Sequence, residues 1–225
     1  MAIRGQNRMI IIIGDSWGVG EWGFEKGSLC VTGPGFATLI SLHDQVINLS
    51  VGGGSNTESL NRLDKLFCQY TPDPIDRFFW VVTCPSRCIT DYSDLKDKNF
   101  KDVIEQHLYS ALSRADCIAK QACIKIELIG GLCDLKNEYI EYFSNLEILV
   151  SSWGEMLDKN YPASIFSPDS KILKLTQRDE NILLDIEKKY NFWQNSEFFP
   201  DDGHPGANAH RILRDKIFPI WSHKY

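Results

Sequence analysis

Two distant segments of the sequence carry residue types that together could perform nucleophilic catalysis. Ser16 lies within Gly14-Asp15-Ser16-Trp17-Gly18, directly after an apolar run, whereas Asp201 and His204 lie three residues apart near the other end. A serine hydroxyl becomes an effective nucleophile when an imidazole accepts its proton and a carboxylate holds that imidazole in one tautomer. These residue types predict Ser16 as nucleophile, His204 as base and Asp201 as the orienting acid.

A glycine-rich segment follows a second apolar run and offers donors for the negative charge that such a reaction creates. It reads Ser50-Val51-Gly52-Gly53-Gly54-Ser55-Asn56. The tetrahedral intermediate of acyl transfer needs N–H groups aimed at its oxyanion. The backbone amide of Ser16 is one predicted donor. The amide of Gly53 is a second, because a residue without a Cβ lets the backbone approach a substrate closely.

Five short apolar runs are the elements that must position these residues. They span 9–13, 46–49, 78–82, 124–129 and 146–150. Each run is continuous rather than alternating, which is typical of strands buried on both faces of a parallel sheet. Ligands of open parallel sheets bind beyond the carboxyl ends of the strands. Because Ser16 and the glycine-rich segment each follow such an end, we expect them to meet at one edge of the sheet.

Helical patterns separate the apolar runs. Ser55 and Glu58 have the spacing of a capping box, and amphipathic stretches are expected after it and at 100–118, 181–193 and 207–221. Strands that alternate with helices predict an α/β fold, a three-layer α/β/α sandwich with a five-stranded parallel sheet in the flavodoxin-like order 2-1-3-4-5. The 225 residues suit a single domain, 1–225, without a break in composition.

Three segments together resemble the motifs of the SGNH hydrolases, a superfamily that includes the GDSL-like lipases and esterases. Gly14-Asp15-Ser16 resembles the first motif, the stretch from Asn48 to Gly53 the second, and Asp201-x-x-His204-Pro205 the last. They occur in the family's order and span nearly the whole sequence. The resemblance implies a serine esterase or deacetylase that works through an acyl-enzyme without a cofactor. It also implies ester substrates, such as acyl or acetyl groups on sugars or lipids.

One family motif has no counterpart in this sequence. SGNH hydrolases usually carry Gly-x-Asn-Asp after the third strand, where the Asn side chain is a further oxyanion donor, but this sequence has no Asn-Asp pair. The matching strand end reads Thr83-Cys84-Pro85-Ser86-Arg87. We favour Arg87 as the substitute donor, because its charged fork could also hold an anionic substrate. Ser86, Asn56 from the neighbouring loop, or no donor at all are the alternatives.

Other motif matches lack essential parts. Gly14-x-Ser16-x-Gly18 also fits the nucleophile elbow of α/β-hydrolases, but there several strands precede the elbow and the acid and base lie far apart. Gly18-x-Gly20-x-x-Gly23 fits a dinucleotide fingerprint, yet further glycines follow where a helix should open. The seven cysteines form no CxxC pair and no zinc-ligand spacing, so we expect no metal and reduced thiols.

Composition limits the partners of the protein. The net charge of −6 argues against binding to nucleic acid, which needs a basic surface. The apolar run 9–13 is shorter than the core of a signal peptide, and no run approaches the length of a membrane span. We therefore expect synthesis in the cytoplasm, with later release left open. The expected partner is a small-molecule or carbohydrate ester; the oligomeric state is not predicted.

The remaining histidines and tryptophans have less specific expectations. We expect the histidines other than His204, namely His43, His107, His210 and His223, on the surface or on helix faces. All six tryptophans are expected in core or rim packing, and Trp17 and Trp22 have the best chance of lining a pocket because they flank Ser16. The intact Ser16, Asp201 and His204 favour an enzyme. The missing Asn favours an SGNH-fold module that binds ligands without efficient catalysis.

Overall fold

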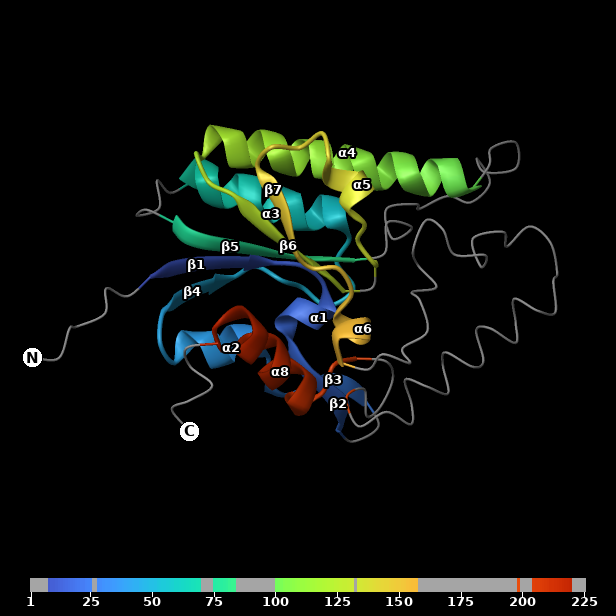
Figure 1. Cartoon of the computed structure of the whole chain (residues 1–225). Coiled ribbons are helices and arrows are strands. Elements are labelled where there is room, and N and C mark those ends of the chain that lie inside the picture. The colour runs from blue at the N-terminus through green and yellow to red at the C-terminus, as the bar shows by residue number, and fades with distance from the viewer. Residues whose placement is uncertain are drawn as a thin grey trace, which may run out of the picture.

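Five parallel strands form the central sheet of the computed structural model, which describes residues 8–25, 28–69, 75–83, 100–131, 133–157, 198 and 204–219. The strands are β1 (Met9–Ile13), β4 (Gln45–Asn48), β5 (Ile75–Val82), β6 (Ile126–Gly130) and β7 (Leu146–Val150). Their spatial order is β4-β1-β5-β6-β7, which is 2-1-3-4-5 when these five are counted along the chain (Figure 1). The predicted fold class and strand order are confirmed.

Burial on both faces explains the continuous apolar runs. Ile10, Ile11, Ile12 and Ile13 of β1 are all 0% exposed, and they alternate between two separate hydrophobic clusters. Ile10 and Ile12 pack with Phe36 and Trp153 on one face, whereas Ile11 and Ile13 pack on the opposite face of the sheet. A strand that contacts two cores has no polar face, so its sequence shows no alternation.

Helices cover both faces of the sheet and complete the three layers (Figure 1). One face carries α3 (Asn56–Gln69), α4 (Phe100–Gln121) and α5 (Asn137–Ile140). The other carries α1 (Ser16–Val19), α2 (Phe36–Ser41), α6 (Trp153–Leu157) and α8 (Ala207–Ile217). The predicted capping box at the start of α3 is present: the Ser55 N–H donates to Glu58 Oε2 at 2.7 Å, and the Glu58 N–H donates to Ser55 Oγ at 3.2 Å.

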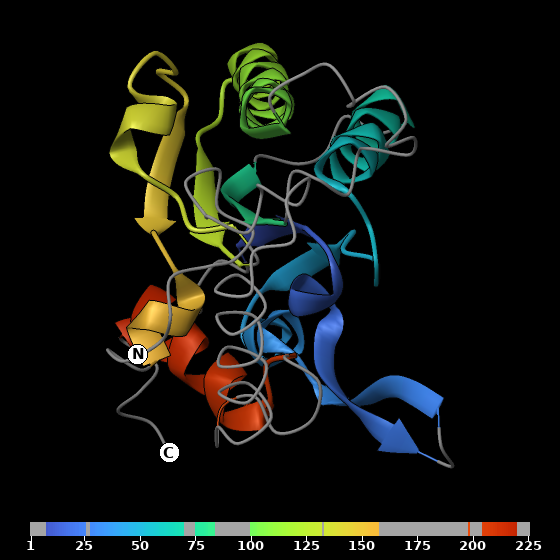
Figure 2. The ribbon, with the colours of Figure 1, turned by 90° about the vertical axis from the view of Figure 1, so that its right-hand side faces the viewer.

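A two-stranded hairpin follows α1, where the sequence analysis predicted no strand. It consists of antiparallel β2 (Gly20–Glu25) and β3 (Ser28–Pro34) and projects from the sandwich beside α1 and α2 (Figure 2). The sequence signal for it was a Gly-containing pair, Lys26-Gly27, between two short runs rich in aromatic and β-branched residues. The predicted helix 207–221 also ends earlier, at Ile217, and the expected helix 181–193 lies outside the described residues.

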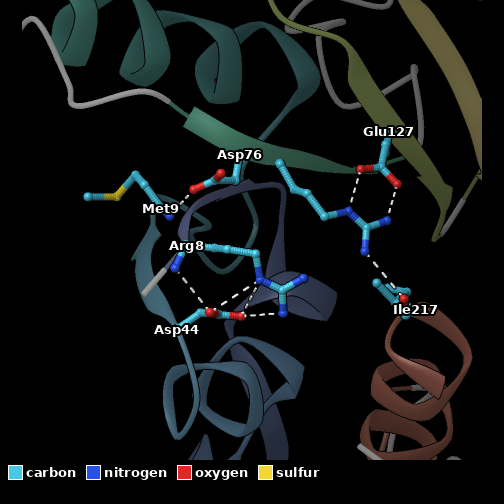
Figure 3. A network of polar contacts seen from close by, with 7 residues as sticks. Arg8, Met9, Asp44, Asp76, Glu127 and Ile217 are labelled. Atoms are coloured by element: carbon cyan, nitrogen blue, oxygen red, sulfur yellow. Dashed lines mark hydrogen bonds and ion pairs between the residues drawn. The ribbon is translucent and has the colours of Figure 1, made fainter. Parts of the chain in front are cut away.

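A network of charged groups closes the amino-terminal edge of the sheet and holds the end of α8 there (Figure 3). Arg8 donates to both carboxylate oxygens of Asp44, with Nη2 to Oδ2 at 2.7 Å. Arg77 on β5 pairs with Glu127 on β6 and donates to the carbonyl of Ile217 at 3.3 Å. The Phe218 ring lies 4.9 Å from the Arg77 guanidinium and 5.2 Å from that of Arg8. These contacts anchor the carboxyl end of α8 to the sheet.

His210 anchors the other end of α8. Of the two expected positions, the surface or a helix face, it occupies a helix face, and that face is buried. Its side chain is 0% exposed, and Nδ1 accepts the N–H of Phe36 at 3.1 Å. The imidazole stacks on the Phe36 ring and meets the Trp153 ring edge-on. Burial lowers the pKa of His210 from 6.5 to about 4, because an imidazolium is costly in this apolar contact. The neutral ring thus ties the first turns of α2 and α8 together.

Replacing His210 by Asn should remove a pH dependence of folding. Between pH 6.5 and about 4, the unfolded chain binds a proton at His210 that the native protein does not bind. In the unmutated protein, the free energy of unfolding should therefore decrease as the pH is lowered through this window, by up to about 3 kcal/mol. Urea denaturation at a series of pH values measures this slope, which should flatten in the variant.

His210→Phe is a control for the packing of the side chain. Phe keeps an aromatic ring in the contact but has no site for a proton and no acceptor for the Phe36 N–H. Both variants should share the flattened slope. Slopes parallel to that of the unmutated protein would contradict the assignment.

Candidate active site

Asp15 and the short helix α1 set the position of Ser16. Asp15 is buried and caps α1, since its Oδ1 accepts the Trp17 N–H at 3.0 Å. Its other oxygen accepts from the Thr83 hydroxyl at 2.5 Å, which links the turn after β1 to the end of β5. One carboxylate therefore fixes the Ser16 turn both locally and across the sheet. The sequence analysis did not single out Asp15 or Thr83.

The structure brings Ser16 and His204 together. The Ser16 Oγ lies 3.0 Å from the His204 Nε2, although the two residues are 188 positions apart in the sequence. Ser16 is almost fully buried and His204 is half-buried. His204 directly precedes the Pro205-Gly206 pair that leads into α8, and the Gly206 N–H donates to the carbonyl of Phe198 at 2.9 Å. The distance suits transfer of the serine proton to the imidazole.

Close backbone approach explains the glycines on either side of Ser16. A Cβ on Gly14 would lie 2.8 Å from the Val81 Cβ, and one on Gly18 would lie 2.4 Å from the Ser50 Oγ. The carbonyl of Gly18 also accepts from the Asn48 side chain at 3.0 Å. The turn that carries Ser16 is therefore packed directly against the ends of β4 and β5.

Gly53 lies in an open part of the loop between β4 and α3. Its φ of +72° is in the left-handed region, and a Cβ built on it would meet nothing within 4 Å. None of the hydrogen bonds among the described residues uses the Gly53 N–H. The residue thus combines an accessible amide with the space for a substrate to approach it, as its predicted role in an oxyanion hole requires.

Asn56 reaches from the start of α3 to the end of β5. Its side chain is buried and pairs with the backbone of Thr83: the amide Nδ2 donates to the Thr83 carbonyl, and Oδ1 accepts the Thr83 N–H, both at 3.0 Å. The side-chain amide makes the two hydrogen bonds that the backbone of an adjacent strand would make, and it thereby fixes the end of β5. One N–H of its amide is thereby used, and Asn56 as a substitute for the missing Asn donor stays a prediction.

The other predicted site residues lie outside the described residues. These are Asp201, the proposed acid, and Ser86 and Arg87, the two proposed donors that follow β5. β5 does pair with β1, with Ile13 opposite Trp80, so the carboxyl end of β5 lies next to the Ser16 turn.

Trp17 belongs to the core, as expected of the tryptophans in general, rather than to a pocket. It is 1% exposed and packs edge-on against Trp153, with ring centroids 5.6 Å apart. Trp80 and Trp153 are buried as well, which confirms the expectation of core packing for these two.

The described part of the chain contains no group of three or more His, Cys, Asp and Glu side chains placed to hold a metal ion. Cys68, Cys117, Cys123 and Cys133 are not in disulfide bonds. Among the described helices, none combines the length and the apolar character needed to cross a membrane.

Comparisons by sequence identify no relative: no protein-family model matches the chain, and no curated protein sequence matches it. Comparisons by structure find solved proteins of similar fold. A carbohydrate esterase described as having an active site with divergent catalytic and non-catalytic binding functions is 12% identical, with a TM-score of 0.50 over 100% of this chain and 67% of its own.

Two further similar structures come from bacteria. One is a member of the lipolytic G-D-S-L family from Veillonella parvula, 14% identical, with a TM-score of 0.44 over 96% of this chain and 99% of its own. The other is an acetylxylan esterase from Geobacillus stearothermophilus, 13% identical, with a TM-score of 0.45 over 96% and 94%. At such identities structural similarity defines the fold. The chain has the fold of the SGNH hydrolases, as the sequence motifs predicted.

The glycines of the site should respond differently to an added methyl group. Gly14→Ala places a Cβ against the Val81 Cβ and should lower the free energy of unfolding by about 2 kcal/mol or more, as overpacking does. Gly53→Ala meets open space and should cost only about 1 kcal/mol, the strain of a left-handed residue. Urea denaturation of both variants measures the difference. A larger loss for Gly53→Ala would contradict the described packing.

Proposed function

We propose that this protein is a serine ester hydrolase that uses Ser16 as nucleophile, His204 as general base and Asp201 as the carboxylate that orients His204. The observation that carries the proposal is the 3.0 Å separation of the Ser16 Oγ from the His204 Nε2. Acyl or acetyl esters, including those on carbohydrates, are the proposed substrates. The carbohydrate esterase of the same fold supports this substrate class.

The proposed reaction proceeds through an acyl-enzyme. The Ser16 Oγ attacks the ester carbonyl carbon while its proton passes to the His204 Nε2. The resulting oxyanion accepts hydrogen bonds from the backbone amides of Ser16 and Gly53. The tetrahedral intermediate then collapses, and His204 protonates the departing alcohol. Water next attacks the acyl group, giving its proton to His204, and Ser16 recovers a proton when the carboxylic acid leaves.

The proposed role of Asp201 is to hold His204 in the tautomer that the reaction needs. Nε2 can accept the serine proton only when it is unprotonated, so Nδ1 must carry the other proton. A carboxylate that accepts this Nδ1–H holds the tautomer and stabilises the imidazolium. Asp201 is preferred to Asp202, because a separation of three residues places two side chains next to each other in a tight turn.

A binding module without efficient catalysis is the second candidate function. Two observations favour it: the sequence lacks the Asn-Asp pair after β5, and the Asn56 amide is bound to the backbone of Thr83. Loss of one oxyanion donor typically lowers turnover about 10²–10³-fold. Such a protein would still bind an ester ligand at the same edge of the sheet.

A fluorophosphonate probe tests the nucleophile directly, because it reacts covalently only with an activated serine. We expect one adduct, mapped to Ser16 by peptide mass spectrometry, and no adduct in Ser16→Ala or His204→Ala. Ser41→Ala is a matched control, since the exposed Ser41 hydroxyl only donates to the Thr38 carbonyl. Labelling of another serine would remove Ser16 from the role. If the unmutated protein shows no labelling and hydrolyses no ester, the binding module is favoured.

Arg87 is the proposed third oxyanion donor, and its removal should affect the reaction more than the fold. Arg87→Ala should lower kcat for an acetyl ester by roughly tenfold or more without changing the unfolding temperature. Ser86→Ala should change kcat less. Steady-state kinetics on both variants decide between them, and an unchanged kcat in Arg87→Ala rules this residue out.

A further inference from the structure

The carbonyl oxygen of Gly14 accepts hydrogen bonds from the loop after β4 and from α3. It accepts the Val51 N–H at 3.2 Å, the Ser59 Oγ at 3.2 Å and the Arg62 Nη2 at 3.3 Å. Gly14 lies two residues before Ser16, whereas Val51 lies two residues before Gly53. The turn that carries the proposed nucleophile and the loop that carries the proposed oxyanion donor are therefore joined at one oxygen atom.

Arg62 on α3 makes further hydrogen bonds to the same two segments. Its Nε donates to the carbonyl of Leu49 at 2.8 Å, at the point where the chain leaves β4. Its Nη2 donates to Gly14 at the end of β1 and to the Ser59 Oγ at 3.1 Å. A single planar guanidinium thus ties together the carboxyl ends of two adjacent strands, which a lysine ammonium could not do with the same geometry.

The same guanidinium also supports the glycine loop. A Cβ on Gly54 would lie 3.1 Å from the Arg62 Nη2, so the side chain packs directly under the residue that follows Gly53. Burial lowers the pKa of Arg62, while the charge of Glu58 acts in the opposite direction. The Arg62 hydrogen bonds described here go to Leu49, Gly14 and Ser59, and none goes to Ser16 or His204.

We infer that Arg62 is a positioning residue, which fixes the Gly53 amide relative to the Ser16 turn so that both donors converge on one oxyanion. The inference rests on the proposed function. An oxyanion hole works because its donors are already aimed when charge develops. A displacement of about 1 Å at such a site can lower turnover by about two orders of magnitude. Loss of Arg62 should therefore change the chemical step more than the binding of substrate.

Arg62→Lys and Arg62→Gly test the inference, and Arg114→Lys is the matched control. Arg114 on α4 also holds α3, by donating to Asn61 and Asp64, yet it contacts neither strand end. We expect kcat for an acetyl ester to fall about tenfold or more in both Arg62 variants, with KM within about twofold. Added guanidinium should restore part of the activity of Arg62→Gly. Arg114→Lys should keep the kcat of the unmutated protein.

Hydrogen–deuterium exchange gives a readout that does not depend on turnover. The peptide covering residues 50–54 should exchange at least about fivefold faster in Arg62→Lys than in Arg114→Lys, because the loop has lost its support. Unchanged kcat, or unchanged exchange in this peptide, would overturn the inference. If the unmutated protein hydrolyses no ester, the proposed function fails, and the exchange result alone decides whether Arg62 holds the loop.

Discussion

The attachment of α8 at both of its ends is the constraint on which the site depends. His204 approaches Ser16 only because the helix that follows it is fixed against the sheet. Arg77 and the ring contacts of Phe218 hold the carboxyl end, and the neutral His210 ring holds the amino end against α2. The hydrogen bond between Ser16 and His204 spans 188 positions, so local sequence preferences alone could not bring the two residues together.

The opposite side of the site is rigid for a different reason. There the chain is held by backbone contacts that leave no space for side chains, as at Gly14 and Gly18, and by donors that converge on the Gly14 carbonyl. Asp15 and Asn56 extend this framework to the end of β5 through Thr83. The hydrogen bonds of the buried Asp15, Asn56 and Ser59 side chains favour one arrangement, because an alternative arrangement would leave these groups unpaired. The open Gly53 amide lies at the margin of this framework.

Sequence reasoning succeeded where the signal was local or came from burial on two faces. The isoleucines of β1 predicted a central strand, and Ser55 with Glu58 predicted the start of α3. It did not reveal the contacts of His210, Trp17 and Asn56, because the role of each depends on what lies opposite. A histidine on a helix face becomes a buried acceptor only when a free backbone N–H, here that of Phe36, is packed against it. No spacing within α8 reveals that partner.

The sequence by itself therefore determined the layers of the fold and the edge at which the chemistry belongs. These follow from which residues avoid water and from the rule that parallel strands end at a common edge. Only the tertiary structure decided that Ser16 and His204 are in contact, that Asn56 pairs with a backbone, and that Arg62 joins two strand ends. Such contacts tolerate displacements of only a few tenths of an ångström, and the packing of segments far apart in the chain sets these positions, which residue spacing does not encode.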